Sequence, residues 1–240
     1  MGIRLDEDHH IHSSFSDDAV STLAENVRAA QDRGLRTVCL AEHVRRDSVH
    51  VPGFVSAVEA LRPVPGMRVL AGVEAKILDQ RGRLDLPGDL GGIDRVLIAD
   101  HQFPGETGPV APGQVRAALG RGDTTAADVV EALVRATAAA LGQARRPQLA
   151  HLFSILPKLG LAESGVPDGL LRLLARQARA SGAVVEVNEK WACPSARSLR
   201  AFTAAGVRVV ASTDSHDCTD VGVYHRVPVI IDQMAPVAGR

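Results

Sequence analysis

The sequence predicts an α/β protein in which repeated strand and helix units build a parallel sheet. Seven short apolar runs rich in β-branched residues alternate with longer stretches that carry apolar residues at helical spacing. Glycines follow several of these longer stretches directly, at the position where they commonly end helices. The pattern fits either a closed barrel or an open doubly wound sheet, because periodicity alone does not distinguish the two.

The composition is that of an ordinary globular protein. The chain has 240 residues, 45% of them hydrophobic, and its 27 lysines and arginines nearly balance 28 aspartates and glutamates. Because a chain of this length can bury roughly 70% of its unfolded surface, we expect one domain over residues 1–240. The net charge of −1 disfavours a protein that grips long nucleic acids and favours a small-molecule partner.

The expected strands are short, and most precede a stretch long enough for a helix. They cover residues 5–12, 37–41, 68–73, 95–99, 148–152, 183–187 and 207–212. The expected helices cover residues 19–33, 126–141, 168–181 and 194–205, and each is followed by a glycine that favours a helix end.

Segments rich in proline and glycine predict the loops. Residues 63–66 and 104–113 are expected to lie on the surface, and residues 79–83 predict a small hairpin turn. The segment 102–121 leaves the fourth strand directly after His101, so we expect it to wall the substrate pocket.

Cysteine usage and the first residues bear on the compartment. The three cysteines are an odd number and show no Cys-x-x-Cys spacing, which argues against a disulfide framework and a Cys-rich zinc site and fits a reducing environment. Cys39 is expected to pack in the core. The first ten residues are acidic and histidine-rich where an export signal needs an apolar core. No apolar run approaches the roughly 18 residues that span a bilayer. We therefore expect a cytoplasmic protein without a membrane partner, and no pattern indicates its oligomeric state.

Histidines and carboxylates gather at the predicted carboxyl ends of the strands. His10 and His12 are two residues apart on the first strand, so both side chains point to one face. Because the carboxyl ends of parallel strands share one rim, where sites form, the residues at the other strand ends should join them there. These residues are His43, Glu74, His101, His151, Asp214 and His216.

So many ligands exceed the needs of one metal ion, since zinc takes about four. The sequence therefore predicts two or three divalent ions, and zinc, manganese and iron all suit histidine and carboxylate ligands. Glu74 is the expected bridging ligand, because a carboxylate can bind two cations. We assign Asp17 to a metal and Asp18 to the N-cap of the helix expected from residue 19.

These motifs resemble the PHP family (polymerase and histidinol phosphatase). The resemblance implies a distorted seven-stranded (β/α) barrel of TIM-like type, with a trinuclear metal site at the carboxyl rim and phosphoester hydrolysis as the usual activity. The second motif reads Ala41-Glu42-His43 where the family often has Thr-Asp-His, which keeps the histidine and changes its neighbours. The runs that carry the resemblance are Asp8-His9-His10-Ile11-His12-Ser13-Ser14-Phe15-Ser16-Asp17, Ala41-Glu42-His43, Gly72-Val73-Glu74, Ile98-Ala99-Asp100-His101, Ala150-His151, Glu186-Val187-Asn188 and Ser212-Thr213-Asp214-Ser215-His216.

The resemblance also implies three sets of ligands and places this chain among the small stand-alone phosphoesterases of the family. All nine positions carry residues able to bind metal, which argues against a merely structural family member. The first metal would take His10, His12, Glu74 and Asp214, the second Glu74, His101 and His151, and the third Asp17, His43 and His216.

The expected reaction is hydrolysis of a small phosphate monoester by a hydroxide that bridges the metals, held through Glu74, Asp214, His10 and His12. Divalent cations lower the pKa of a bound water and hold the phosphoryl oxygens. Positive or ring-bearing side chains near the rim should seat the substrate, and the only tryptophan could stack on a substrate ring. The candidate substrate-binding residues are Lys190, Arg45, Arg46, Asn188 and Trp191.

Other functions fit parts of the pattern. An amidohydrolase-like barrel also starts with His-x-His, but it usually has a bridging lysine. A phosphodiesterase or exonuclease acting on short nucleic acids would use the same metal chemistry, although only seven aromatic residues are available to stack on bases. A non-catalytic, metal-stabilised protein would have a closed four-coordinate site, unlike this surplus of ligands.

Overall fold

Seven parallel strands form the centre of the molecule. The computed structural model describes residues 2–235. The strands lie in the order β1-β2-β3-β4-β7-β8-β9, so neighbours in the sheet follow one another along the chain. They are β1 (Glu7–Ile11), β2 (Thr37–His43), β3 (Arg68–Lys76), β4 (Arg95–Ala99), β7 (Pro147–Leu149), β8 (Val184–Asn188) and β9 (Arg208–Ser212).

The first and last strands meet and turn the sheet into a nearly closed barrel. The backbone N–H of Asp214 donates to the carbonyl of His10, and that of His12 donates to the carbonyl of Ser215, both at 2.9 Å. Ile11 and Ser215 form a parallel bridge at the same place. The predicted barrel is confirmed over the open sheet that periodicity also allowed.

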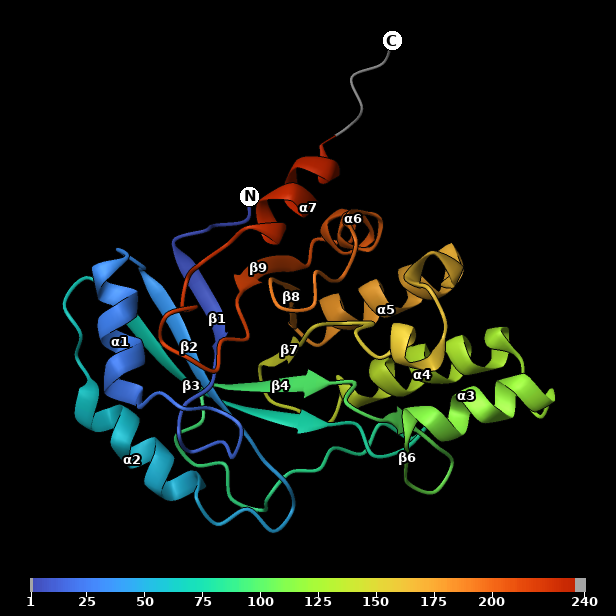
Figure 1. Cartoon of the computed structure of the whole chain (residues 1–240), viewed down its shortest axis with the longest axis horizontal. Coiled ribbons are helices and arrows are strands. Elements are labelled where there is room, and N and C mark those ends of the chain that lie inside the picture. Colours follow the sequence, from blue (N-terminus) through green and yellow to red (C-terminus); the bar gives the residue numbers. More distant parts are fainter. Residues whose placement is uncertain (1, 236–240) are drawn as a thin grey trace.

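Helices surround the strands, with α1 and α2 beside β1 to β3 and α4 and α5 on the side of β7 (Figure 1). Among the described residues, no helix is long and apolar enough to cross a membrane. The helices are α1 (Leu23–Asp32), α2 (Val51–Leu61), α3 (Pro112–Arg121), α4 (Ala126–Ala140), α5 (Asp168–Ala180), α6 (Ala196–Ala204) and α7 (Arg226–Met234), with short 3-10 turns at Leu156–Leu159 and Glu163–Gly165.

Several elements differ from those predicted. Three helices, α2, α3 and α7, were not predicted, and each has a proline in its first turn. The predicted loop 104–113 holds part of a small antiparallel hairpin, β5 (Phe103–Pro104) with β6 (Pro109–Val110). The turn at 79–83 is confirmed, since the N–H of Leu78 donates to the carbonyl of Arg83 at 2.7 Å.

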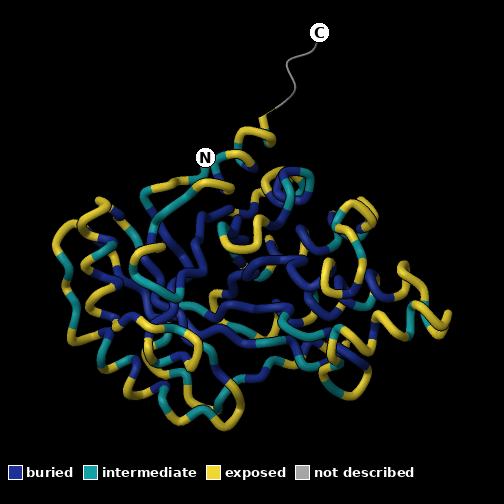
Figure 2. Tube along the Cα trace, in the orientation of Figure 1, coloured by how far each residue is buried: buried dark blue, intermediate teal, exposed yellow. Residues whose placement is uncertain are grey.

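The inside of the barrel is filled by four small side chains and two leucines, whereas most of the larger apolar residues lie between the strands and the helices. Figure 2 shows the strands as the most buried part of the molecule. Because side chains alternate along a strand, these interior residues share their faces with His43, Glu74 and His101, one step nearer the carboxyl rim. The interior cluster is Cys39, Ala41, Leu70, Leu97, Ala99 and Ala150, which confirms Cys39 as a core residue and forms a floor beneath the rim.

Candidate metal centre

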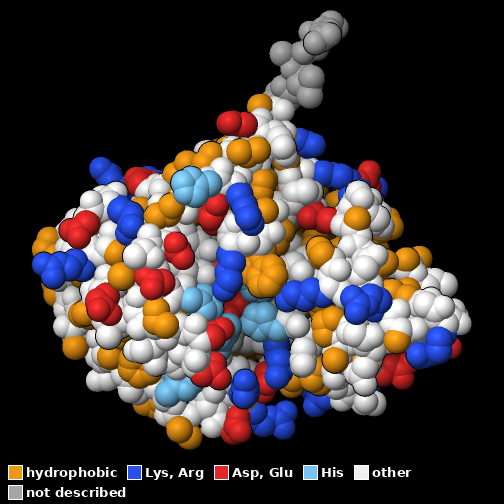
Figure 3. Space-filling view, in the orientation of Figure 1, with side chains coloured by type: hydrophobic (Ala, Val, Ile, Leu, Met, Phe, Trp, Pro, Cys, Tyr) orange, Lys and Arg blue, Asp and Glu red, His pale blue; other side chains and the backbone are white. Residues whose placement is uncertain are grey.

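The histidines and carboxylates predicted from the strand ends converge at the carboxyl rim. Figure 3 shows histidine and acidic side chains in a hollow at the centre of one face, with lysines and arginines around it. The hollow has a volume of about 350 Å³. Segments from both ends of the described chain contribute, because β1 and β9 are neighbours in the barrel.

His10, His12 and Asp214 form the most buried part of the site. The Nε2 atoms of His10 and His12 lie only 2.9 Å apart. Oδ1 of Asp214 lies 3.4 Å from Nε2 of His12 and 3.9 Å from Nε2 of His10. Two imidazole nitrogens this close repel each other unless a proton or a cation lies between them, so this trio has the arrangement of a metal site.

Glu74 lies at the centre of the site. Its Oε1 is 2.8 Å from Nε2 of His151 and 3.2 Å from Nε2 of His101. Its Oε2 is 2.8 Å from Nδ1 of His43 and within 3.6 Å of His10 and His12. Although it is buried, Oε2 accepts no hydrogen bond within residues 2–235. A carboxylate that faces imidazoles on both sides has the position of a bridging ligand.

His43, His216 and Asp18 form the third group. Oδ2 of Asp18 is 3.4 Å from Nε2 of His43 and 3.3 Å from Nε2 of His216. The prediction that Asp18 caps a helix is wrong, because α1 begins at Leu23 and its N-cap is Thr22, which forms a capping box with Glu25.

Asp17 does not occupy the position predicted for it. Its side chain lines the hollow. Within the described part of the chain, however, it forms no ion pair with His43 or His216, whereas the neighbouring Asp18 carboxylate faces both. The turn between residues 13 and 18 directs the second of the two carboxylates to the histidines.

Buried polar side chains behind the histidines fix their rings. Ser16 Oγ donates to Glu42 at 2.6 Å, accepts the N–H of His43 at 3.0 Å and lies 3.3 Å from Nδ1 of His12. Because the Ser16 proton is already donated, Nδ1 of His12 must be the donor in that contact. The Nε2 atom of His12 is then left bare for a metal.

His151, which follows β7, is held by a similar arrangement of polar side chains. Nδ1 of His151 lies 2.9 Å from Ser154 Oγ, which donates to Oδ1 of Asp100 at 2.7 Å. Its Nε2 then faces Glu74 and the centre of the site. Such outer partners are typical of histidines that bind metal.

The charges within the site are strongly coupled. Burial alone would raise the pKa of Glu74, but His101 and His10 hold that pKa well below its usual range. Burial disfavours a charged His151, yet contacts with Asp100 and Glu74 raise its pKa to about 10. Burial lowers the pKa of His12 to about 4. The carboxylates are therefore ionised, and they demand positive charge at the positions where metal ions would replace protons.

The backbone is strained at two of the ligand positions. His151 has φ of 29° and Asp214 has φ of 57°, in the left-handed region that residues other than glycine rarely adopt. Such strain persists only where the surrounding structure holds it, and it concentrates at functional sites. Three features fit divalent metal ions: the histidine and carboxylate donors, the Oε2 atom of Glu74 that accepts no hydrogen bond within residues 2–235, and the histidine rings held in place by outer hydrogen bonds.

The predicted substrate-binding residues divide into two groups. Lys190, Trp191 and Arg45 line the hollow. Asn188 does not face it, because the side chain is fully buried, donates to Glu186 and accepts the N–H of Trp191. Arg46 is also not among the residues that line it, so the structure brings neither of these two side chains into the hollow.

One residue of the hollow was missed. Lys158, in the 3-10 turn Leu156–Leu159, lines the hollow with its ammonium 4.3 Å above the ring of Trp191. It follows β7 at a distance of several residues, and only a search of every cation after every strand would have found it. Trp191 itself donates its indole N–H to Oδ2 of Asp214 at 2.9 Å.

The segment 102–121 does not wall the metal centre. Phe103, Val110 and Val115 line a separate cavity of about 300 Å³ against α4. His101, which directly precedes that segment, lines the hollow, whereas no residue of 102–121 is among the lining residues. The hairpin of β5 and β6 contributes to that separate cavity instead, which corrects the predicted position of the substrate wall.

Fold and site together define a barrel protein whose carboxyl rim is built to hold divalent cations. The PHP domain matches residues 8–150 of this chain, which is more than half of its length, and the protein therefore belongs to the PHP family. This confirms the family that the motifs indicated.

Solved structures and sequence relatives agree with this assignment. The chain is similar to histidinol phosphate phosphatase from Lactococcus lactis subsp. lactis, with a TM-score of 0.68 and 17% identity, over 95% of this chain and 93% of that one. The crystals of that protein contain zinc, L-histidinol and phosphate. At this identity the likeness establishes the fold.

Two sequence relatives carry the name "Probable phosphatase". The first, from Caldanaerobacter subterraneus subsp. tengcongensis, is 37% identical over 89 residues, which are 36% of this chain and 35% of the relative. The second, from Caldicellulosiruptor bescii, is 32% identical over 123 residues, 48% of this chain and 49% of the relative. The matches thus span between about a third and a half of these relatives.

Proposed function

We propose that this protein is a metal-dependent phosphatase that hydrolyses a small phosphate monoester at a trinuclear site. The observation that carries the proposal is Glu74, whose two oxygens face imidazoles on both sides while Oε2 accepts no hydrogen bond from residues 2–235. The family membership and the phosphatase names of the relatives support it.

The ligand sets follow the geometry. His10, His12, Glu74 and Asp214 would hold one ion, and Glu74, His101 and His151 a second. Asp18, rather than Asp17, would join His43 and His216 around the third. When bound, divalent ions supply an activated water and neutralise the phosphoryl oxygens.

The side chains around the hollow prepare it for a phosphate dianion. Lys190 Nζ lies 3.2 Å from Nδ1 of His216 and 3.9 Å from Oδ1 of Asp214, so its charge is directed at the site. Arg45 and Lys158 add positive charge from other parts of the wall. The indole N–H of Trp191 holds Oδ2 of Asp214 and leaves Oδ1 facing His12. These residues bind and orient the substrate.

The test is phosphate release by purified protein loaded separately with zinc, manganese or iron. The panel contains small monoesters, cyclic diesters and short oligonucleotides. We expect release from monoesters, and we expect Glu74→Ala to lose bound metal and turnover together while Glu131→Ala, an exposed helix variant, keeps both. Cleavage of only diesters or oligonucleotides, or a fully metallated and active Glu74→Ala protein, would overturn the proposal.

A further inference from the structure

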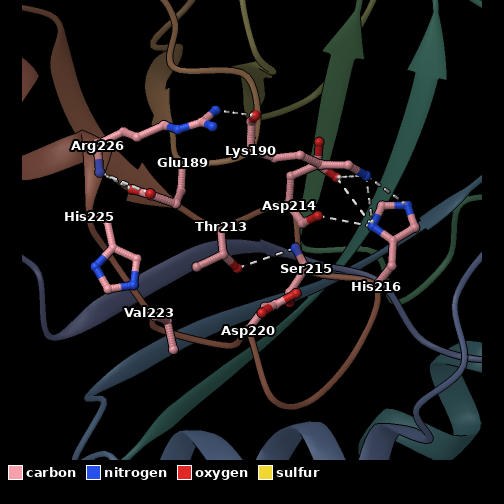
Figure 4. A pocket seen from close by; sticks show the side chains of 10 residues that line it. All are labelled: Glu189, Lys190, Thr213, Asp214, Ser215, His216, Asp220, Val223, His225 and Arg226. Carbon is pink, nitrogen blue, oxygen red and sulfur yellow. Dashed lines mark hydrogen bonds and ion pairs between the residues drawn. The ribbon is translucent and has the colours of Figure 1, made fainter.

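A second cavity opens directly beside the metal centre. It has a volume of about 400 Å³ and shares Lys190, Asp214 and His216 with the hollow that holds the candidate ligands. The rest of its wall comes from Glu189 and from the segment between β9 and α7. Figure 4 shows the side chains that line it. A substrate with its phosphate at the metal centre can extend the rest of the molecule into this cavity.

Most of the charged groups in the cavity are already paired. The carboxylate of Glu189 accepts the backbone N–H groups of Arg226 and Val227 at 2.9 Å, at the start of α7. The guanidinium of Arg226 donates to the carbonyl of Lys190 at 3.1 Å. Lys190 directs its ammonium toward the metal ligands.

Three groups in the cavity lack partners within residues 2–235, and one of them is the exposed imidazole of His225. The carboxylate of Asp220 forms no hydrogen bond or ion pair with any residue in 2–235, and its side chain is exposed to the cavity. Ser215 is only 3% exposed, and its hydroxyl likewise has no partner in this part of the chain. A buried hydroxyl without a partner is rare in folded proteins, so it points to a missing one.

We propose that this cavity receives the leaving alcohol and selects short alcohols that carry hydroxyl or ammonium donors. The carboxylate of Asp220 is the acceptor that forms a hydrogen bond with these donors. The inference rests on the proposed phosphatase function and deepens it. In the hydrolysis, a water oxygen bonds to phosphorus as the ester P–O bond breaks, and the alcohol leaves with a proton on its oxygen. The alcohol is therefore the part of the substrate that the cavity must recognise.

Chemistry disfavours a plain alkyl group beside Asp220. Such a group would desolvate the carboxylate of Asp220 without giving it a hydrogen bond, which is unfavourable. Val223 is the only aliphatic side chain among the residues that line the cavity within 2–235. Specificity then resides in the segment after β9, on a different side of the rim from the expected loop 102–121.

The experiment uses phosphonates that cannot be hydrolysed, with the metal-loaded protein. Three probes of nearly equal size are compared by calorimetry: propylphosphonate, 2-hydroxyethylphosphonate and 2-aminoethylphosphonate, each followed by its homologues with one and two more methylenes. We expect a hydroxyl or amino probe to bind about tenfold more tightly than its alkyl counterpart, the gain of a hydrogen bond to a charged group. Whichever donor gains more identifies a polyol or an amino alcohol as the leaving group.

Variants then locate the effect. Asp220→Ala should remove the difference between donor and alkyl probes, and Asp220→Asn should reduce the amino preference more than the hydroxyl preference. Asp232→Asn, the same change on the exposed side of α7, should leave all affinities as in the wild type. The melting temperature of each variant confirms that it is folded.

The outcomes separate the two ideas. Suppose that all probes bind and phosphate esters are hydrolysed, but Asp220→Ala does not change the preference for donor probes over alkyl probes. The cavity inference is then wrong, and the phosphatase proposal stands. If the wild type prefers the alkyl probe, the cavity inference is also wrong. If no phosphonate binds and no ester is hydrolysed with any of the three metals, the phosphatase proposal fails and the inference fails with it.

Discussion

Nδ1 of His10 lies 3.1 Å from Oε2 of Glu186, a fully buried carboxylate on β8. The same carboxylate accepts the backbone N–H of His151 at 2.6 Å and the side-chain amides of Gln148 and Asn188 at 2.7 and 2.8 Å. One buried group thereby fixes the positions of two residues that we propose as ligands of different ion sites. Because it holds the proton of His10 on Nδ1, it leaves Nε2 bare.

Replacing Glu186 should weaken metal binding. We expect Glu186→Gln to lower zinc affinity about 10- to 100-fold, the usual effect of removing an outer partner of a metal-binding histidine. Competition with a chromophoric chelator measures the affinity, and Glu131→Gln serves as a surface control. An unchanged affinity, with the His10 tautomer also unchanged by nitrogen NMR, would show that other groups orient the ring.

Asp18 and Asp17 give a second prediction. Since Asp18 faces His43 and His216, Asp18→Ala should lower the number of bound ions by one, whereas Asp17→Ala should keep the wild-type number. Elemental analysis of dialysed protein measures both. Loss of one ion from Asp17→Ala but not from Asp18→Ala would show that Asp17 is the ligand at the third site.

Gly72 tests the packing beneath the site. A Cβ atom at Gly72 would lie 2.8 Å from Sγ of Cys39 and 3.2 Å from Cδ1 of Leu97. We therefore expect Gly72→Ala to lower the free energy of unfolding by about 1–3 kcal/mol through overpacking. Because Cys39→Ala removes the closest atom, the double variant should recover much of that loss, and urea unfolding of the four proteins measures the coupling. Additive effects would show that the strands move apart instead.

The thiol of Cys39 predicts a dependence of stability on alkaline pH. Burial raises its pKa from 9.0 to about 11. The folded protein then holds this proton more tightly than the unfolded chain, so its stabilising effect is complete below pH 9 and is lost as the pH rises toward 11. The loss amounts to at most about 3 kcal/mol for two pKa units.

Urea unfolding between pH 8 and pH 11 checks this effect. The free energy of unfolding should fall more steeply for the wild type than for Cys39→Ala. Cys218→Ala, which removes a partly exposed cysteine, should behave as the wild type does. Equal slopes for all three proteins would mean that Cys39 does not titrate in this range.

The ends of the strands could be predicted because burial and parallel topology constrain them strongly. β4 was predicted at its observed bounds, and all the strand-end histidines of the motifs reach one rim. The three helices that were not predicted, α2, α3 and α7, carry Pro52, Pro112 and Pro228 in their first turns, and proline otherwise disfavours a helix. A proline in the first turn is favourable for a helix, because the backbone N–H that it lacks has no partner there anyway.

Choosing between Asp17 and Asp18 needed the structure. Both lie in an irregular turn, where no periodicity states which side chain points inward. The prediction that segment 102–121 walls the substrate pocket failed for the same reason. The path of the chain after His101 depends on a hairpin of two very short strands, which no periodicity indicates. Sequence patterns describe regular elements well and the paths of loops poorly.

The order of the strands around the barrel has a consequence for synthesis of the protein on the ribosome. His10 and His12 emerge early, but the carboxylate of Asp214 and the imidazole of His216 are added more than 200 residues later, and β9 must dock on β1 before the four can meet. A nascent chain therefore carries only scattered candidate ligands until β9 has been synthesised and has docked on β1. A chain truncated before β9 is unable to form the complete cluster.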